Sequence, residues 1–404
     1  MKENRKAPEI RFPEYTDDWE QRKLGELGEI STGSTPSTSN SAYYSEDGIP
    51  WVTPTDINTL TISDTPRKLS EEGAKVGRVV PANTILCTCI ASIGKNTLLT
   101  VKGSFNQQIN SLTPYDENDA YFLLTESEIW SNIMKRMAAS GTMQIVNKTE
   151  FSELKTMVPS LAEQQQIGTY FRNLDNLITL HQRKCDKIKE LKSCMLQKMF
   201  PKKGDTKPEI RFPEFTDDWE QRKLSDEFKN FIVPMRDKPK EFGGNIPWTR
   251  IEDIEGKYLN DSLSGQYVTE ETINQMNLKI IPKDSLIVSS SATFGVVAVI
   301  TQDLITNQTF IGLVPNDKET LDYWYAFFHS DEARKYMRLQ SAGSTIFYIA
   351  RESFENMPIK VPTKDEMIKI GTYFDNLDNL ITLHQRKCDE LKELKKGMLQ
   401  KMFV

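Results

Sequence analysis

The residues of this chain that could do catalytic chemistry are few, and none stands in a complete catalytic motif. Residues 93–97, IGKNT, resemble the end of a phosphate-binding loop. Such a loop needs a glycine five positions before Gly94 and Ser or Thr after the lysine, and this sequence has neither. The run 153–155, ELK, has the Glu-x-Lys form of some nucleases, but the same form recurs inside predicted helices at 190–192 and 393–395. We therefore expect that the protein is not an enzyme.

The sequence also offers little to a metal ion or a cofactor. Cys87 and Cys89 form a lone Cys-x-Cys without the second pair that a zinc site needs. No Gly-rich dinucleotide fingerprint is present, nor is the Asn-Pro-Pro-aromatic or Asp-Pro-Pro-aromatic run of amino-methyltransferases. Only three histidines are available as general bases. We expect this chain to bind no metal and no cofactor.

Amide and hydroxyl side chains gather at two matching places and have the chemistry for reading DNA bases. Asn106-Gln107-Gln108 follows one β-rich run, and Asn307-Gln308 follows another. Asn and Gln can bond adenine bidentately in the major groove, and Ser and Thr hydroxyls can donate or accept. The residues alone fit a loop-capping asparagine equally well. The candidate DNA-binding residues are Thr53, Lys95, Asn106, Gln107, Gln108, Thr142, Gln144, Arg250, Asn307, Gln308, Ser344, Tyr348 and Arg351.

These candidates lie in a chain that contains two stretches of sequence, each repeated almost without change. Residues 8–24, PEIRFPEYTDDWEQRKL, return at 208–224 with one change, Tyr15 to Phe215. A second stretch, IGTYFRNLDNLITLHQRKCD at 167–186, returns at 370–389 and differs only in that Arg172 becomes Asp375. Two poorly alike segments lie between the repeats, at 25–158 and 225–361. Repeated stretches that enclose two different segments indicate two recognition domains of different specificity on one pseudo-symmetric scaffold. We call these two domains the readers.

Two long helices are predicted to connect the readers. Residues 163–200 contain no proline and lie between Pro159 and Pro201, and Pro362 precedes the second copy. Each helix of about 38 residues would be roughly 57 Å long. Apolar residues spaced by three and four predict a coiled-coil seam, and two matching seams favour antiparallel pairing over packing of each helix on its own domain. The predicted seam is Ile167, Leu174, Leu177, His181, Ile188 and Leu191, with Ile370, Leu377, Leu380, His384, Leu391 and Leu394.

The two variable segments share a plan that predicts an α+β fold. Each has an Ile-Pro-Trp followed by Asp-Ile, in which Trp51 and Trp248 are interpreted as core anchors and Asp56 and Asp253 as turn residues. β-rich runs are predicted at 84–90 and 96–101, and again at 285–290 and 295–300. Helices near 119–138 and 319–339 follow, and then short strands that end at Pro159 and Pro362. The predicted divisions are a first domain at 1–160, a helix at 161–204, a second domain at 205–362 and a helix at 363–404.

Composition sets limits on location and partners. The N-terminus MKENRKAPEI lacks an apolar signal core and no run of about 20 apolar residues exists, so a cytoplasmic protein without a membrane segment is expected. The net charge is −6, yet residues 163–207 carry ten Lys or Arg against five Asp or Glu. A protein that binds phosphates strongly normally has a basic surface. This chain alone should bind DNA weakly and borrow positive charge from a partner.

The repeated openings, the Ile-Pro-Trp and Asp-Ile pairs, and the helix starts EQQQIGTYF (163–171) and EMIKIGTYF (366–374) resemble the specificity subunits of type I restriction–modification systems. The resemblance implies that each variable domain recognises one half of a bipartite site in double-stranded DNA. It also implies that the helices form an antiparallel spacer on which two modification subunits dock. Restriction subunits would join them, with S-adenosylmethionine, ATP and Mg²⁺ bound by these partners.

The second helix start departs from the first. Contacts that Gln164–Gln166 could make with a modification subunit need not be equal on the second side, where Met367, Ile368 and Lys369 stand. Two alternatives remain open. One is the specificity subunit of a type IIB-like enzyme with a fused nuclease–methylase partner. The other, from a different class, is an adaptor with two protein-binding domains.

Overall fold

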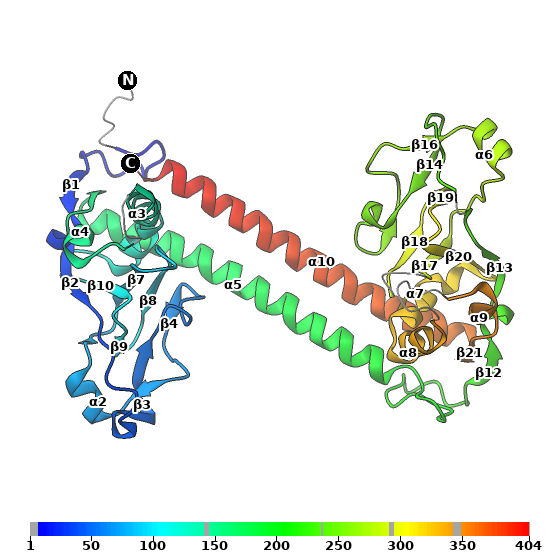
Figure 1. Ribbon diagram of the computed structural model, residues 1–404, viewed down its shortest axis with the longest axis horizontal. Helices are drawn as coiled ribbons and strands as arrows, with labels where there is room; N and C mark the ends of the chain where they lie inside the picture. Colours follow the sequence, from blue (N-terminus) through cyan, green and yellow to red (C-terminus); the bar gives the residue numbers. More distant parts are fainter. Residues whose placement is uncertain (1–6, 141–144, 236, 291–294, 342–348, 404) are drawn as a thin grey trace. The chain divides into compact units, whose positions relative to one another are not determined.

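The computed structural model describes residues 7–140, 145–235, 237–290, 295–341 and 349–403. The chain forms two compact units (Figure 1). Unit 1 comprises residues 1–181 and 386–404, and unit 2 comprises residues 182–385. This division differs from the four predicted segments, because each long helix contributes one part to each unit.

The helices and strands of the first half of the chain are more numerous than the sequence patterns predicted. Its strands are β1 (Glu20–Lys23), β2 (Gly28–Thr32), β3 (Tyr44–Val52), β4 (Thr61–Ile62), β5 (Lys68–Leu69), β6 (Val79–Val80), β7 (Thr84–Thr88), β8 (Asn96–Leu99), β9 (Gly103–Phe105), β10 (Ile109–Pro114) and β11 (Lys155–Val158). Its helices are α1 (Leu24–Leu27), α2 (Glu71–Val76), α3 (Ala120–Ser140), α4 (Lys148–Ser152) and α5 (Leu161–Lys198).

The second half repeats this order with few changes. Its strands are β12 (Glu220–Lys223), β13 (Phe228–Ile232), β14 (Ile246–Thr249), β15 (Tyr258–Leu259), β16 (Tyr267–Val268), β17 (Ser285–Ser289), β18 (Val297–Ile300), β19 (Ile305–Thr306), β20 (Phe310–Pro315) and β21 (Pro358–Val361). Its helices are α6 (Glu270–Met276), α7 (Leu321–His329), α8 (Asp331–Gln340), α9 (Arg351–Glu355) and α10 (Lys364–Lys401).

The sheets confirm the predicted α+β fold and its duplication. Unit 1 contains a five-stranded sheet in the order β2-β10-β7-β8-β4, and unit 2 contains the matching order β13-β20-β17-β18-β15. A second sheet, β5-β3-β9-β6, corresponds to β16-β14-β19. In each second sheet the strand that carries the Ile-Pro-Trp motif pairs in parallel with the short strand before the amide cluster. That parallel pair brings the ends of the two strands to one edge.

The predicted helix near 319–339 is two helices in the structure. α7 ends at His329, and α8 begins after Ser330, whose side chain accepts a hydrogen bond from the Ala333 amide. Ser330 has extended backbone angles (φ −67°, ψ 155°), and a serine in this conformation caps the helix that follows it. The equivalent helix of unit 1, α3, runs through without a break.

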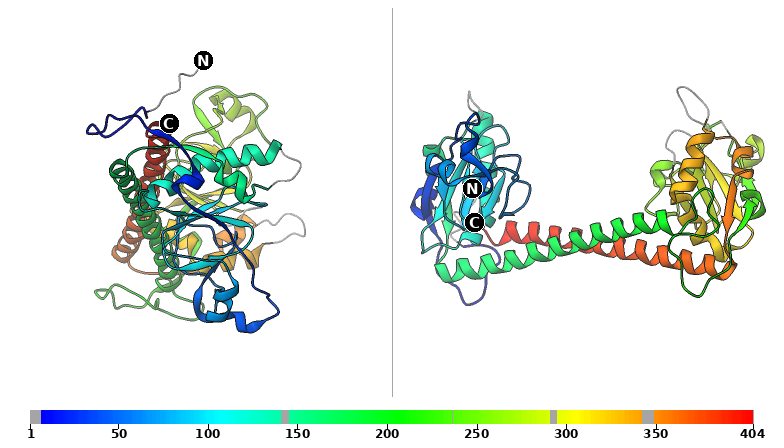
Figure 2. Two further views of the ribbon diagram at one scale, coloured as in Figure 1. Left: turned by 90° about the vertical axis from the view of Figure 1, so that its left-hand side faces the viewer. Right: turned by 90° about the horizontal axis from the view of Figure 1, so that it is seen from below.

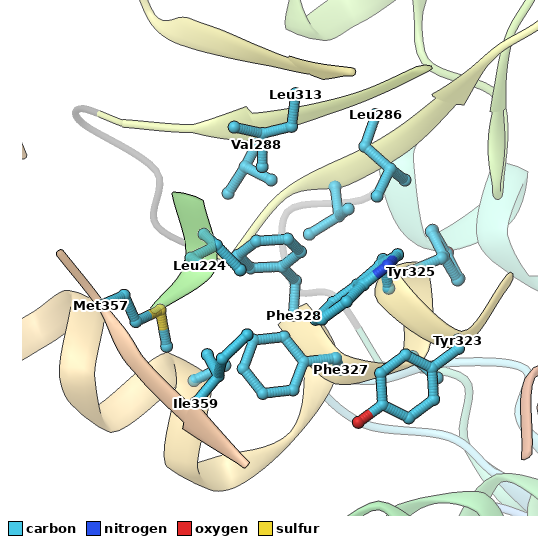
Figure 3. Packing of buried hydrophobic residues seen from close by; sticks show 14 of the residues in the cluster. Leu224, Leu286, Val288, Leu313, Tyr323, Tyr325, Phe327, Phe328, Met357 and Ile359 are labelled. Carbon is cyan, nitrogen blue, oxygen red and sulfur yellow. The ribbon is translucent and has the colours of Figure 1, made fainter. Parts of the chain in front are cut away.

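An aromatic-rich core holds each unit together. In unit 2, α7 lays Tyr323, Phe327 and Phe328 beneath strand residues such as Leu286 and Leu313 (Figure 3). In unit 1, α3 supplies the equivalent layer over β7 and β8. The end of α10 completes the core of unit 1, where the ring centroids of Phe403 and Trp19 lie 6.1 Å apart.

The two long helices pair antiparallel within each unit, as predicted (Figure 2). In unit 1, Lys395 Nζ lies 2.9 Å from Asp175 Oδ1, and Cys388 Sγ lies 3.9 Å from the Ile178 carbonyl. In unit 2, Cys185 Sγ lies 3.9 Å from the Ile381 carbonyl. Partners therefore run in opposite sequence directions. The heptad positions of the seam are Phe171, Leu174, Ile178, His181, Cys185, Ile188, Lys192 and Met195, with Phe374, Leu377, Ile381, His384, Cys388, Leu391, Lys395 and Met398.

Four residues of the predicted seam are wrong. Leu177, Leu191, Leu380 and Leu394 are 43, 40, 42 and 42 % exposed, because they stand one position before seam residues and point beside the seam. The other predicted seam residues are buried or half-buried, although Ile167 and Ile370 belong to the domain cores. The spacing of the leucines misplaces the seam, because some of the true seam positions are occupied by residues that are not leucine, such as Cys185 and Lys192.

Candidate nucleic-acid interface

The amide clusters form two equivalent turns, between β9 and β10 and between β19 and β20. Asn106 Oδ1 accepts a hydrogen bond from the Gln108 amide at 3.0 Å, and Asn106 Nδ2 donates to Gln108 Oε1 at 3.3 Å. Asn307 Oδ1 accepts from the Thr309 amide at 3.3 Å. Short-range bonds of this kind are how asparagine shapes a turn. Both asparagines hold their turns, while Gln107 and Gln308 stand exposed at the tips.

Each turn is fixed to the neighbouring sheet. The Asn106 amide donates to the Val52 carbonyl at 3.0 Å, and the Asn307 amide donates to the Thr249 carbonyl at 3.1 Å. Because β3 and β9 are parallel, the residue after β3, Thr53, lies beside Asn106. The same register in unit 2 places Arg250 beside Asn307. The structure thus brings Thr53 together with one turn and Arg250 with the other.

The aspartates of the Asp-Ile pairs are turn residues, as predicted. Asp56 Oδ2 accepts hydrogen bonds from the Thr53 amide at 2.8 Å and the Thr53 hydroxyl at 2.6 Å. Asp253 Oδ2 accepts from the Arg250 amide at 2.7 Å, and its Oδ1 accepts from the Leu263 amide at 2.8 Å. The Thr53 hydroxyl is therefore occupied locally. The Arg250 side chain also has local contacts, because its Cζ lies 5.9 Å from the Trp248 ring centroid and its Nε lies 3.9 Å from Glu252 Oε2.

The two tryptophans are core anchors, as predicted. Trp51 and Trp248 are 4 and 5 % exposed, and Trp51 Nε1 donates to the Ser34 carbonyl at 3.1 Å. Arg67 Cζ lies 5.9 Å from the Trp51 ring centroid, and Lys238 Nζ lies 5.4 Å from the Trp248 centroid. Both distances suit a cation–π contact. Arg67 and Lys238 were absent from the predicted site, and because they occupy different sequence positions, comparison of the repeats could not have found them.

Two further candidates, Lys95 and Arg351, lie on other elements than the turns. Lys95 is exposed in the β7–β8 loop, where Gly94 has a positive φ of 81° and the Lys95 amide donates to the Thr88 hydroxyl at 2.9 Å. Arg351 begins α9, and its Nε lies 2.6 Å from Glu355 Oε1. The other four candidates, Thr142, Gln144, Ser344 and Tyr348, lie outside the described residues.

The described residues contain neither a candidate metal centre nor a candidate membrane span. Among them, no group of three or more His, Cys, Asp or Glu is arranged to hold a metal ion. In the same portion of the chain, none of the helices combines the length and the apolar character needed to cross a membrane.

Comparison with known proteins places this geometry in a family. The sequence profile described as "Type I restriction modification DNA specificity domain" matches residues 16–190 and again 216–393. The MjaVIII specificity subunit of Methanocaldococcus jannaschii is 22 % identical over 420 aligned residues, which cover 98 % of this chain and 93 % of that protein. The HindI specificity subunit of Haemophilus influenzae is 31 % identical over 171 residues, which cover 40 % of this chain and 37 % of that protein.

Another relative and one solved structure agree with this assignment. The MjaIX specificity subunit, also from M. jannaschii, is 27 % identical over 46 % of this chain, and the match spans 44 % of that protein's length, or less than half of it. The S subunit of the type I restriction–modification system of M. genitalium has a similar fold, with a TM-score of 0.59 and 14 % identity over 98 % of this chain and 99 % of that chain. With two matches to the family profile that together cover most of its length, this chain belongs to the family of type I restriction–modification DNA specificity domains.

Proposed function

We propose that this chain is the sequence-recognition subunit of a type I restriction–modification complex, in which each variable domain reads one half of a bipartite DNA site. The observation that carries the proposal is the duplicated turn, in which a structural asparagine presents an exposed glutamine, Gln107 or Gln308, at the edge of a parallel strand pair. A glutamine side chain can bond adenine at two atoms in the major groove. One such turn in each domain provides one reader for each half-site.

The chain contributes recognition and leaves chemistry to its partners. Its net charge of −6 opposes tight binding to phosphates, so partner subunits supply the positive surface that holds the DNA backbone. Those modification and restriction subunits bind S-adenosylmethionine, ATP and Mg²⁺. In this assignment the specificity subunit itself does no methylation or cleavage.

The long helices supply equivalent surfaces for two modification subunits. In unit 1, Leu177 and Leu180 of α5 are 43 and 46 % exposed, and Leu394 of α10 is 42 % exposed. These leucines flank the same side of the antiparallel seam, since residues at the g positions of such a pair face one another. Unit 2 repeats this set with Leu380, Leu383 and Leu191. Exposed apolar residues that are repeated in this way suit two copies of one partner.

Gln164 is unsuited to a partner contact. Its side chain is buried, its Oε1 accepts from the Asp119 amide at 3.0 Å, and its Nε2 donates to the Pro159 carbonyl at 3.0 Å. Gln166 Nε2 donates to Glu14 Oε1 at 2.8 Å on the surface. Any effect of the altered second helix start on partner binding should therefore come from the exposed Gln165 and the half-buried Gln166, which Ile368 and Lys369 replace on the second side.

The test is a gel-shift assay of the purified chain with and without its modification partner. We expect weak, non-specific binding by the chain alone and tight, site-specific binding by the assembly. Replacing Leu177 and Leu180 with Ser should weaken assembly, whereas replacing Glu190, an exposed residue of the same helix, with Gln should not. Sequence-specific binding that does not change when the partner is added would contradict the proposal of borrowed charge.

A further inference from the structure

The two long helices differ at one position over the stretch 167–186 and 370–389, where Arg172 becomes Asp375. Arg172 contacts Tyr121 of α3, and Asp375 shares an ion-pair partner with Asp322 of α7. Gly168 approaches the Phe122 amide so closely that a Cβ there would lie 3.0 Å from it, and at Gly371 a Cβ would lie 2.6 Å from the Tyr323 amide. These matching contacts make Phe122 equivalent to Tyr323. The preceding residues, Tyr121 and Asp322, are therefore equivalent as well.

In unit 1 the variable position contacts an aromatic ring. Arg172 Cζ lies 4.8 Å from the ring centroid of Tyr121, within the range of a cation–π contact. The hydroxyl of Tyr121 donates to Asp175 Oδ2 at 3.0 Å, so the ring is held in place beneath the guanidinium. The third position is Leu60, which immediately precedes β4 and whose carbonyl accepts a hydrogen bond from the Leu98 amide of β8.

In unit 2 the same three positions form an ion cluster. Lys257, which immediately precedes β15 and so corresponds to Leu60, has an Nζ 2.6 Å from Asp322 Oδ1 and 2.5 Å from Asp375 Oδ1. Its side chain is 7 % exposed. Burial lowers the pKa of the Lys257 amine, but the hydrogen bonds to both aspartates outweigh burial and hold the pKa above its usual value. The lysine is therefore charged and paired.

One ion pair beside these positions is the same in both units. Lys395 pairs with Asp175 in unit 1, and the equivalent Lys192 pairs with Asp378 in unit 2. Beside this repeated ion pair, Leu, Tyr and Arg in unit 1 are replaced by Lys, Asp and Asp in unit 2. Two of the three residues belong to the variable segment, and only the third belongs to the repeated helix. The single difference between the helices thus accompanies differences in the domains that they carry.

We propose that position 172/375 is the residue that matches each long helix to its own variable domain. If the residues at positions 172 and 375 were exchanged, each would lose the side chain that it contacts in its own unit. Asp375 opposite Tyr and Leu would have no cation to pair with, and Arg opposite Lys257 would place two like charges beside a buried amine. An exchange of variable segments is therefore tolerated best when this helix residue is exchanged with the segment. The inference concerns folding of the units and holds whether or not the turns read DNA.

The test measures Asp375→Arg in two backgrounds of the full chain. In the wild-type background, the substitution should lower the melting temperature of unit 2 by roughly 3–8 °C. In the background Lys257→Leu with Asp322→Tyr, which recreates the unit 1 set, the same substitution should raise it by a similar amount. Amide hydrogen exchange over residues 225–361 reports on unit 2 separately from unit 1.

Two controls keep the test decisive. Asn376→Arg adds a cation at the neighbouring exposed position and should leave both backgrounds unchanged. If the double variant does not fold, the reciprocal pair answers the question: Arg172→Asp should destabilise wild-type unit 1 and stabilise the Leu60→Lys, Tyr121→Asp variant. A shift of the same sign in both backgrounds, or no shift in either, would overturn the matching role.

Discussion

Arg11 and Glu163, which are 152 residues apart in sequence, form a bidentate ion pair with both N–O distances at 2.7 Å. Arg211 and Glu366 form the same pair in unit 2, also at 2.7 Å. Both glutamates are almost fully buried, at 1 and 0 % side-chain exposure. Each pair fastens a repeated opening segment to the start of a long helix. This contact explains why the openings and the helices are the repeated parts of the chain.

Removing one arginine should destabilise only its own unit. Arg11→Ala leaves the buried Glu163 carboxylate without its partner, and breaking a buried pair in this way costs about 3 kcal/mol. Arg22→Ala removes an exposed ion pair with Glu20 and should cost less than about 1 kcal/mol. Urea unfolding followed by hydrogen exchange in each unit checks both values. Equal losses for the two variants would contradict a clamp role for Arg11.

Phe403 should be as important to the stability of unit 1 as Phe200 is to the stability of unit 2. Phe403 stacks on Phe122 with ring centroids 5.5 Å apart, and the equivalent Phe200 lies 5.7 Å from Tyr323. Replacing a buried Phe with Ala costs about 3–5 kcal/mol. We expect Phe403→Ala to weaken protection from hydrogen exchange in unit 1 and Phe200→Ala to weaken it in unit 2. An effect of either variant on the opposite unit alone would contradict this packing.

Glu126 should make unit 1 less stable as pH rises. Burial raises the pKa of its carboxyl to about 8, and a hydrogen bond from Thr156 offsets this only in part. The ordinary value is 4.5, so the folded state holds the proton more tightly than the unfolded state. The stability that Glu126 contributes to unit 1 is therefore fully present below pH 4.5 and is lost as pH rises through about 8.

The measurement for Glu126 is the urea midpoint of unit 1 between pH 5 and pH 9. The wild type should lose stability across this range, whereas Glu126→Gln, which cannot ionise, should show a flatter profile and be the more stable protein at high pH. Glu128→Gln, two residues further along α3 and half exposed, is the matched control. Parallel profiles for wild type and Glu126→Gln would show that the carboxyl does not cause the loss.

The helices should set the spacing of the recognised half-sites. Deleting seven residues from both α5 and α10 preserves the heptad phase and shortens each helix by roughly 10 Å, the length of about three base pairs. We expect the half-site sequences to persist while the DNA spacer shortens. Sequencing of methylated adenines in a host that expresses the variant with its partners measures both. New half-sites with an unchanged spacer would contradict this role.

The sequence predicted the fold well because its signals were local or duplicated. The runs at 84–90 and 285–290 became β7 and β17, and the tryptophans and aspartates of the repeated motifs took their predicted structural roles. Long-range features were harder to predict. The packing of Phe403 on Trp19 could not be derived from periodicity, although the repeat of LQKMF at 196–200 and 399–403 was an available signal. Lys192 is charged, so an apolar pattern does not place it in the seam. The fold can place it there because Asp378 pairs with its charge.

The candidate site was predicted only in part, for a physical reason. Residue type identifies groups that can bond a base, but it does not reveal which of them the backbone already uses. Asn106 and Asn307 satisfy amides of their own turns, so their oxygens are engaged before any ligand arrives. The Gln107 oxygen is also engaged, because it accepts a hydrogen bond from the Thr35 hydroxyl. The exposure of Gln107 and Gln308 therefore distinguishes them from the asparagines, and only the fold reveals it.

The central claim is that each variable domain reads one half-site, and Gln107→Ala and Gln308→Ala test it most directly. Each variant is assembled with its modification partner and bound to a library of half-site variants, with Glu190→Ala, a change at an exposed residue of α5, as the control. The account predicts that each variant loses about 1–3 kcal/mol of discrimination at one or two bases of a single half-site, a different half-site for each. Unchanged preference with a lowered melting temperature, or relaxation of both half-sites by one variant, would contradict it.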